Sequence, residues 1–524
     1  MKNGKIFDMR RYNYLLGILL TVFCSCSFCL AQQQSSVISK PVTNVWYQSG
    51  VFWVWPMMHT DRQSDVVVFQ PVAKTQKNLL VKIDNGDFSV TTSNLQLPAK
   101  NYDSYGAFVG NDGRRRLLYF HHETAPKTCY LHLDVIDPDV EKNTLVADAS
   151  ILSFEYEITY DIEIVMSPKK EIFALVVYHK DYADNISKIH AAVFDQNGNM
   201  MWEKDVQPEL EEPFIRTSNY CLDDKGMLYM PILGIEKDKE GKTITKQHLY
   251  LLKIGENDLQ VNPVDEPFGV TSHVMAQLSE NGKVWIFGFY QEGLNELATE
   301  TGAFLTLFDP VSQEFTPVSY QTFDADYFAK YPKTDLTAPH PTRPWYHIRG
   351  NNLFELPNGD VVVCGEHVSR TVTHSMDYGY YTCRTGDILV AKFHPDHSFT
   401  AQIVPKNQTG VSIIRPKDWR QSYVSYSAFV RQNDLYLVYN DAAANVPFPG
   451  KGEGLSISPW GANNKCVSVC TKIADNGDVS QQAFVQFQDS KQMFRDFLFA
   501  DDHDFYVSLI QKKGISFAKY PLPQ

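Results

Sequence analysis

Three polar and aromatic segments in the second half of the chain carry residue types that recognise polar ligands. Tyrosine and tryptophan offer flat apolar faces, arginine a planar fork of donors, and histidine and aspartate hydrogen-bonding groups. Together these groups suit a glycan or a protein partner. Residues 321–347 contribute Tyr327, Tyr331, His340, Arg343 and Trp345. Residues 366–385 contribute His367, Arg370, His374, Tyr378, Tyr380 and Tyr381, and residues 441–464 contribute Asp441, Asn445 and Trp460.

A metal site would need several histidines to converge. Imidazoles suit zinc or copper, and these segments hold His340, His347, His367 and His374. None of these forms a pair at a short, fixed spacing with a carboxylate, so we expect neither a metal nor a cofactor. His121 and His122 are neighbours on a predicted strand, where successive side chains point to opposite faces. That strand therefore cannot present both to one ion.

The same residue types leave two classes of function open. A non-catalytic binding or scaffold protein is the leading hypothesis. The alternative is a carbohydrate-active enzyme, a polysaccharide lyase or glycoside hydrolase, because tyrosine serves as the nucleophile in some glycosidases. The chain has no S-x-D-x-G-x-T-W box, and residues 454–458 do not form a Gly-x-Ser-x-Gly elbow. We therefore assign no catalytic residue.

Residues 351–408 predict the structural unit that positions these segments. Four short strands are expected, at residues 352–356, 361–364, 387–393 and 399–404. The first two are joined by Asn358-Gly359, a pair that supplies the positive φ values of a tight hairpin turn. The two central strands are almost continuously apolar, which is typical of strands buried on both faces. A four-stranded meander with a buried centre predicts one blade of a β-propeller.

The unit repeats along the chain. The first strands of eight apolar pairs are expected at residues 65–69, 117–120, 172–178, 227–233, 283–289, 360–364, 434–439 and 504–509. Their partners are expected at residues 78–83, 129–136, 189–194, 248–254, 303–308, 387–393, 465–473 and 515–520. The sequence therefore predicts an all-β protein with a single β-propeller of four-stranded antiparallel blades. Eight blades are expected, with seven as the alternative.

Ring closure is predicted from the two ends of the chain. The last unit has only three expected strands, and a spare strand at residues 43–47 is free to complete it. Such a strand would remove the open edges of the sheet. The propeller domain would then span residues 43–524, after a linker at 32–42.

Topology places the three polar segments on a common face. In a four-stranded meander, the first and third turns lie at one end of the blade. The second loop and the link to the next blade lie at the other end. The three segments are all of the second kind, so we expect them on one loop-rich face over two adjacent blades. Long loops on a rigid scaffold commonly carry function.

The N-terminus predicts export. Residues 1–31 combine basic residues, a short apolar core and a small residue before Gln32, as in a signal peptide. Cys26 is a possible lipid anchor, although the sequence leaves a soluble form open. No apolar run is long enough for a transmembrane segment. The net charge of −13 gives no basic stripe for nucleic acid.

Six cysteines follow the predicted signal peptide, too few for a disulfide scaffold in so long a chain. Cys466 and Cys470 would lie roughly 13 Å apart on a strand, beyond disulfide reach. A Cys364–Cys383 bridge would staple a long loop. The other interpretation is that all six are buried free thiols.

Several short patterns resemble uncharacterised secreted β-propeller-like proteins of Gram-negative bacteria. These are LPNGD at residues 356–360, GDILVAKF at 386–393, and YLVYND at 436–441 followed by Asn445. The resemblance implies a propeller and an extracytoplasmic location, in the periplasm, at the outer-membrane surface or secreted. It implies no catalytic residues.

Overall fold

A computed structural model of the chain describes 23 segments, and every structural statement below concerns these residues. They are residues 37–38, 42–43, 53–60, 63–69, 78–84, 89–96, 102–124, 127–137, 139–144, 150–155, 160–180, 186–207, 210, 220–237, 244–264, 270–291, 299–331, 347–374, 379–412, 425–446, 466–486, 492–511 and 514–523. The predicted signal peptide at residues 1–31, with Cys26, lies outside them.

The described strands form eight sheets, each named below by its two central strands. The β4/β5 sheet holds β3 (Trp53–Thr60), β4 (Gln63–Phe69), β5 (Asn78–Asp84), β6 (Val90–Gln96) and β10 (Lys142–Thr144). The β8/β9 sheet holds β7 (Tyr102–Val109), β8 (Arg115–Thr124), β9 (Lys127–Ile136) and β11 (Ser150–Glu155). The β13/β14 sheet holds β12 (Tyr160–Met166), β13 (Ile172–Lys180), β14 (Ile186–Asp195) and β15 (Met200–Val206).

Two further sheets lie in the middle of the chain. The β17/β18 sheet holds β16 (Cys221–Leu222), β17 (Leu228–Lys237), β18 (Ile244–Ile254) and β19 (Leu259–Pro263). The β21/β22 sheet holds β20 (Val270–Leu278), β21 (Val284–Gln291), β22 (Glu300–Asp309), β23 (Glu314–Phe315) and β24 (Ser319–Thr322).

The last three sheets come from the C-terminal part. The β26/β27 sheet holds β25 (His347–Glu355), β26 (Val361–His374), β27 (Gly379–Phe393), β28 (Phe399–Val404) and β29 (Gln408–Ser412). The β31/β32 sheet holds β30 (Tyr426–Arg431), β31 (Asp434–Ala442), β32 (Cys466–Ile473) and β33 (Val479–Gln486). The β35/β36 sheet holds β34 (Gln492–Ala500), β35 (Asp504–Gln511), β36 (Gly514–Pro521), β1 (Val37–Ile38) and β2 (Val42–Thr43).

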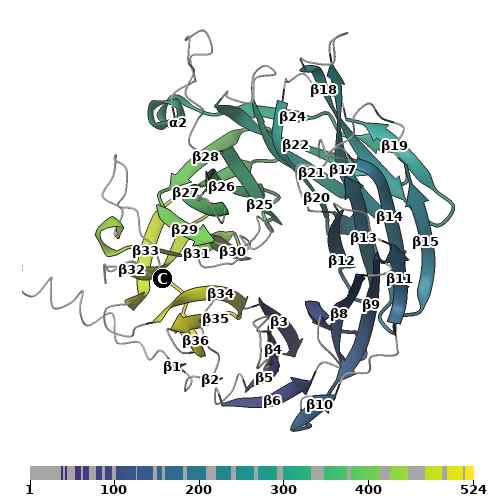
Figure 1. The fold of residues 1–524 in the computed structure, drawn as a ribbon. Coiled ribbons are helices and arrows are strands. Elements are labelled where there is room, and N and C mark those ends of the chain that lie inside the picture. Colours follow the sequence, from purple (N-terminus) through teal and green to yellow (C-terminus); the bar gives the residue numbers. More distant parts are fainter. Residues whose placement is uncertain are drawn as a thin grey trace, which may run out of the picture.

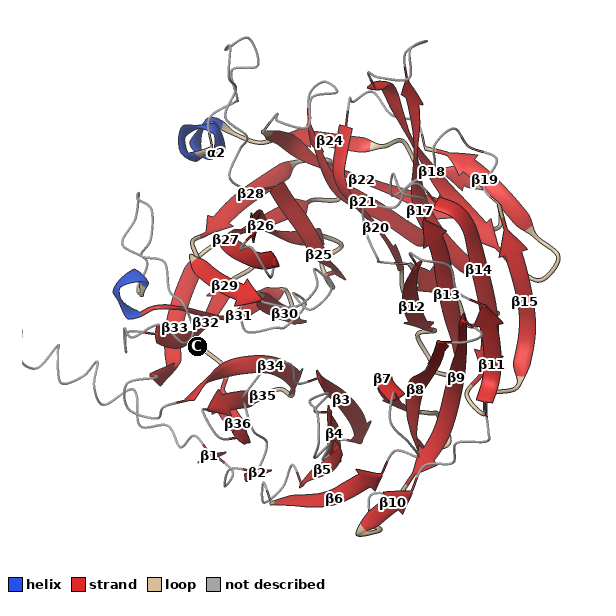
Figure 2. Ribbon diagram, viewed as in Figure 1, coloured by secondary structure: helices blue, strands red, loops and turns tan. Residues whose placement is uncertain are grey.

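The sheets follow one another around a ring in chain order, with β12, β20, β25 and β34 near its centre (Figure 1). Strands dominate the described residues, and the helix α2 (Ala325–Lys330) lies outside the sheets (Figure 2). This arrangement of four-stranded antiparallel sheets is that of a β-propeller. The predicted all-β class and the eight predicted central strand pairs are confirmed.

Burial on both faces explains why the central strands are continuously apolar. On β13, Ala174 and Val176 pack toward the β17/β18 sheet. The alternate residues Leu175 and Val177 pack toward the β8/β9 sheet. Because successive side chains point to opposite faces, a strand between two neighbouring sheets must be apolar at every position.

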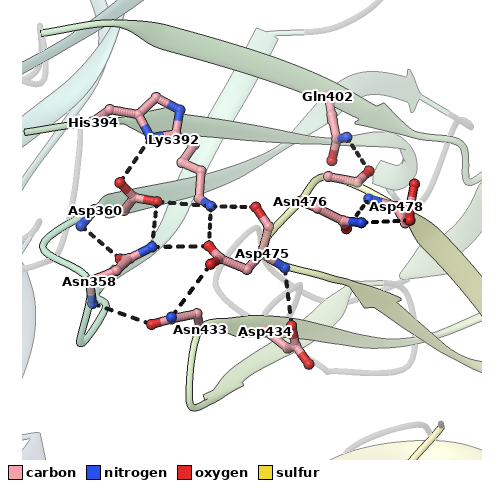
Figure 3. A network of polar contacts seen from close by, with 11 residues as sticks. Asn358, Asp360, Lys392, His394, Gln402, Asn433, Asp434, Asp475, Asn476 and Asp478 are labelled. Carbon is pink, nitrogen blue, oxygen red and sulfur yellow. Dashed lines mark hydrogen bonds and ion pairs between the residues drawn. The ribbon is translucent and has the colours of Figure 1, made fainter. Parts of the chain in front are cut away.

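Short glycine turns hold neighbouring sheets together at one end of the ring, called here the turn face. Gly359 and Gly477 have φ values of 88° and 87°, as the Asn-Gly pairs predict. Figure 3 shows how these turns meet: Lys392 Nζ lies 2.9 Å from Asp360 and 3.0 Å from Asp475 of the next sheet. Gln402 Nε2 donates to the Gly477 carbonyl at 2.7 Å (Figure 3). The turns thus connect adjacent sheets through ion pairs and hydrogen bonds.

The N-terminal strands add to the last sheet. Both β1 and β2 pair antiparallel with β36, with Val37 opposite Lys519 and Val42 opposite Ile515. Of the strand predicted at residues 43–47, only Thr43 is described, and it faces Gly514. The strand β1 falls within the segment expected to be a linker.

The expectation of a long loop at residues 366–385 is wrong. Both central strands continue beyond β25, which pairs with β26 only as far as Val368. The strand β26 runs to His374 and β27 starts at Gly379, and they pair up to these two positions. The added strand β29 pairs with the outer part of β27. This stretch is rich in threonine, valine and tyrosine, which favour strands. It is therefore a projecting hairpin.

The cysteines whose side chains the structure describes are free and buried: Cys129, Cys221, Cys364, Cys466 and Cys470. The considered Cys364–Cys383 bridge is therefore absent. Strand register explains this, because Cys364 pairs with Val390 whereas Cys383 pairs with Arg370, six positions along the hairpin.

Within the described part of the chain, no helix has the length and apolar character needed to cross a membrane.

Candidate functional site

A polar cluster centred on Asp387 lies at the loop end of the β26/β27 sheet, opposite the turn face. The Asp387 carboxylate accepts a hydrogen bond from the Tyr331 hydroxyl and pairs with the Lys330 ammonium group. The backbone N–H of Lys406 donates to its other oxygen at 3.1 Å. Asp387 thus joins the helix α2, the base of the hairpin and the segment after β28.

A β-bulge aims the side chains of this cluster. The β26/β27 register shifts between Glu366 and Val368, so that Glu366 faces Ile388 and Val368 faces Thr385. His367 lies at this shift, and Gly386 and Asp387 lie opposite it. Bulges kink a strand and redirect its side chains, and they recur beside functional sites. The local fold thus turns Glu366 and His367 into a buried layer.

The helix α2 brings two tyrosines onto His367. Asp324 caps the helix by accepting from the Tyr327 N–H at 2.9 Å. The Tyr331 ring stacks on the His367 ring, with centroids 4.1 Å apart and planes within 13°. Because His367 Nδ1 lies 3.2 Å from the Asp387 carbonyl, which only accepts, Nδ1 carries the proton. His367 Nε2 therefore accepts from the Tyr327 hydroxyl at 3.5 Å.

Burial sets the charges of this layer. It lowers the pKa of His367 and raises the pKa of Tyr327 well above the ordinary tyrosine value. Both side chains are therefore neutral at pH 7. His367 is 1% exposed and Tyr327 2% exposed, so they support the site from below. Tyr331 and Lys330 are partly exposed and are the members of this layer that a ligand can contact.

A buried ion pair lies beside this layer. Lys406 Nζ donates to Glu366 Oε2 at 2.6 Å and to Thr385 Oγ1 at 3.1 Å. The Ser425 hydroxyl donates to the other Glu366 oxygen. Both charged side chains are almost fully buried, so each depends on the other for compensation. Ser425, just before β30, thus links the pair at the hairpin base to the start of the β31/β32 sheet.

Asp441 extends the cluster into the β31/β32 sheet. Its Oδ1 accepts from the Ala442 N–H and from Asn445 Nδ2, both at 2.7 Å, and so holds the short 3-10 helix Ala443–Asn445. Burial raises the pKa of Asp441 to about 7, and the positive charge of Lys406 opposes this shift. Asp441 and Asn445 are buried and shape the start of the segment at residues 441–464.

Five residues predicted from the sequence thus lie in one structural neighbourhood: Tyr327, Tyr331, His367, Asp441 and Asn445. The backbones of Arg370, His374, Tyr380 and Tyr381 lie in the projecting hairpin. His340, Arg343, Trp345, Tyr378 and Trp460 lie outside the described residues.

Sequence reasoning missed Lys330, Glu366, Asp387 and Lys406. Asp387 looked like the first residue of an ordinary strand. Its signal was the preceding Gly386, since a glycine inside a strand pattern often marks a bulge.

Within the described residues, no group of three or more histidine, cysteine, aspartate or glutamate side chains is arranged to hold a metal ion.

Comparisons with known proteins found similar solved structures but no related sequence. The sequence matches no protein-family model, and no curated protein matches it. The β-propeller domain of the Trilobed protease from Pyrococcus furiosus is 9% identical, over 71% of this chain and 94% of that one, with a TM-score of 0.34. The polysaccharide lyase Uly1 is 10% identical, over 93% and 94%, with a TM-score of 0.38. A protein of unknown function from Dyadobacter fermentans is 10% identical, over 92% and 99%, with a TM-score of 0.31.

The protein is thus a β-propeller by its own sheet arrangement, and its structural neighbours include bacterial proteins of unknown function. At these identities and TM-scores the likeness carries no information on activity. No sequence match connects the chain to a family.

Proposed function

We propose that this chain is an extracytoplasmic, non-catalytic β-propeller that binds a glycan or protein partner on its loop-rich face. The ring has eight blades and is closed by N-terminal strands. The eight sheets and the pairing of β1 and β2 with β36 support this closure. Export follows from the predicted signal peptide at residues 1–31, with Cys26 as a lipid anchor in the lipoprotein form.

The observation that carries the binding proposal is the fixed position of Tyr331. Its ring is stacked on buried His367, and its hydroxyl is tied to Asp387. The neighbouring Lys330 is tied to the same carboxylate. Side chains that are already ordered lose little conformational entropy when a ligand binds. An aromatic ring and an ammonium group held in this way suit recognition of a polar ligand.

Substitution of Tyr331 tests this proposal. The mature protein is screened against a glycan array and against envelope proteins of the cell that produces it. The ligand that binds best is then titrated. Tyr331→Ala should weaken binding by about tenfold or more, as expected for loss of an aromatic contact. Tyr320→Ala is the matched control, because Tyr320 is also a partly exposed tyrosine but lies on β24 of the neighbouring sheet. Equal affinities for wild type and Tyr331→Ala would refute the assignment.

A second candidate function is glycoside cleavage. It is favoured by the hydrogen bond from Tyr331 to Asp387, because a tyrosine beside a carboxylate can act as a nucleophile whose proton the carboxylate takes. Lys330 already occupies the same carboxylate, which favours an anchoring role. Reducing ends released from neutral or acidic polysaccharides by wild type, and abolished in Tyr331→Phe, would establish the enzyme. Binding without product release supports the first proposal.

A further inference from the structure

A second row of polar side chains crosses one face of the β8/β9 pair, on the side of the ring away from the β26/β27 sheet (Figure 1). In the strand register, His121 faces Tyr130 and Tyr119 faces His132. Each pair is stacked, with centroids 5.7 Å and 4.9 Å apart. The two histidine rings lie 6.5 Å apart across the diagonal.

A carboxylate stands at each end of this row. Tyr119 Oη donates to Asp134 Oδ2 at 2.6 Å. At the other end Tyr130 Oη donates to Glu123 Oε2 at 3.4 Å. The resulting order defines the Tyr–His ladder: Glu123, Tyr130, His121, His132, Tyr119 and Asp134. Tyr119 and His132 are buried, whereas Glu123, Tyr130 and His121 are partly exposed near the β8/β9 hairpin.

The opposite face of the same strands shows that folding does not require a polar layer here. Leu118, Phe120 and Leu131 point to that face and form an apolar core with the β13/β14 sheet. Burying an imidazole costs free energy that a leucine or valine would not. The polar side chains of the ladder therefore make the folded state less stable than an apolar layer between the sheets would. Functional sites often carry such a cost.

We propose that the exposed end of the ladder, formed by Glu123, Tyr130 and His121, binds a neutral, hydroxyl-rich ligand, namely an uncharged saccharide. A carboxylate accepts hydrogen bonds from sugar hydroxyls, whereas phenol and imidazole groups both donate and accept. The carboxylates of Glu123 and Asp134 would repel an anionic ligand.

The buried end of the ladder holds a neutral imidazole at His132. Burial and the proximity of His121 lower the pKa of His132, so His132 is neutral at pH 7. Its stack on Tyr119, which is itself tied to Asp134, fixes the rings behind His121. His132 and Tyr119 are therefore positioning residues, and the three exposed side chains make the ligand contacts.

Calorimetric titration of the mature protein tests this site. The neutral probes are cellohexaose, maltohexaose and mannohexaose, and the acidic probe is hexagalacturonate. At least one neutral probe should bind, and the acidic probe should not. Tyr130→Phe removes one hydroxyl and keeps the stacked ring, so it should weaken binding by about 5- to 10-fold, the value of one hydrogen bond. The bound saccharide should also protect His121 from carbethoxylation, measured by peptide mass spectrometry.

Two controls separate this site from general effects. His248→Asn alters another partly exposed histidine beside a carboxylate, Glu236, on the β17/β18 sheet and should leave affinity unchanged. Tyr320→Ala, on β24 of the β21/β22 sheet, should also leave it unchanged. Protection of His121 reports this site alone, so failure of one site does not decide the other. The proposal is overturned if no neutral probe binds, if only hexagalacturonate binds, or if Tyr130→Phe matches wild type.

Discussion

Asp441 should make the stability of this protein fall as the pH rises from about 4 to about 7. A buried carboxyl whose folded pKa is about 7 binds its proton more tightly than the unfolded chain, where the pKa is about 4. Asp441 then costs no stability below about pH 4. The free energy of unfolding falls as the pH rises from about 4 to about 7, and the loss stays constant above about pH 7. This sign is opposite to that of aspartates with lowered pKa, such as Asp112.

The size of the effect follows from the two pKa values. Between pH 5 and pH 8 the loss that Asp441 causes should grow by about 2 to 3 kcal/mol. Asp441→Asn removes the titration and keeps an oxygen for the Ala442 N–H and Asn445 Nδ2 bonds. Any fixed cost of the new amide group shifts the whole stability curve of the variant without changing its slope.

Urea unfolding of wild type and Asp441→Asn at half-unit steps from pH 5 to 8 measures this difference. Other titrating groups, including buried His367, affect both proteins alike and cancel in the comparison. The variant should gain stability relative to wild type as the pH rises. A difference that stays constant over this range would show that Asp441 titrates as an ordinary surface carboxylate. A change in the opposite direction would also contradict the raised pKa of Asp441.

Two further changes test other parts of the fold. Lys406→Met leaves the Glu366 carboxylate buried without its partner and should lower the free energy of unfolding in urea by about 3 to 5 kcal/mol. Adding Glu366→Gln should recover most of this loss. No recovery would contradict the ion-pair account. Gly282→Ala should cost only about 1 to 2 kcal/mol, since its φ is 80° but its Cβ would meet nothing within 4 Å. Gly302→Ala should cost more, because its Cβ would lie 2.0 Å from the Gln321 carbonyl oxygen, and equal losses would contradict this.

Local patterns in the sequence were sufficient to predict the repeated unit. Continuous apolar runs such as that at Val361–Val363 predicted strands buried on both faces, and Asn-Gly pairs predicted the turns at Gly359 and Gly477. These features depend on a few adjacent residues, so they can be recognised without knowledge of the rest of the chain.

The residues that build the candidate site depended on tertiary structure. The hairpin beyond Glu366 mixes strand-favouring residues with polar residues that are equally common in loops. Its structure was decided by the pairing of β26 with β27 and of β27 with β29. Asp387 gained its role only when a bulge turned it toward Lys330 and Tyr331, which are more than fifty residues earlier in the chain. Sequence by itself determined where strands and turns form, because local chemistry decides them. Which polar groups meet was decided by long-range register and packing.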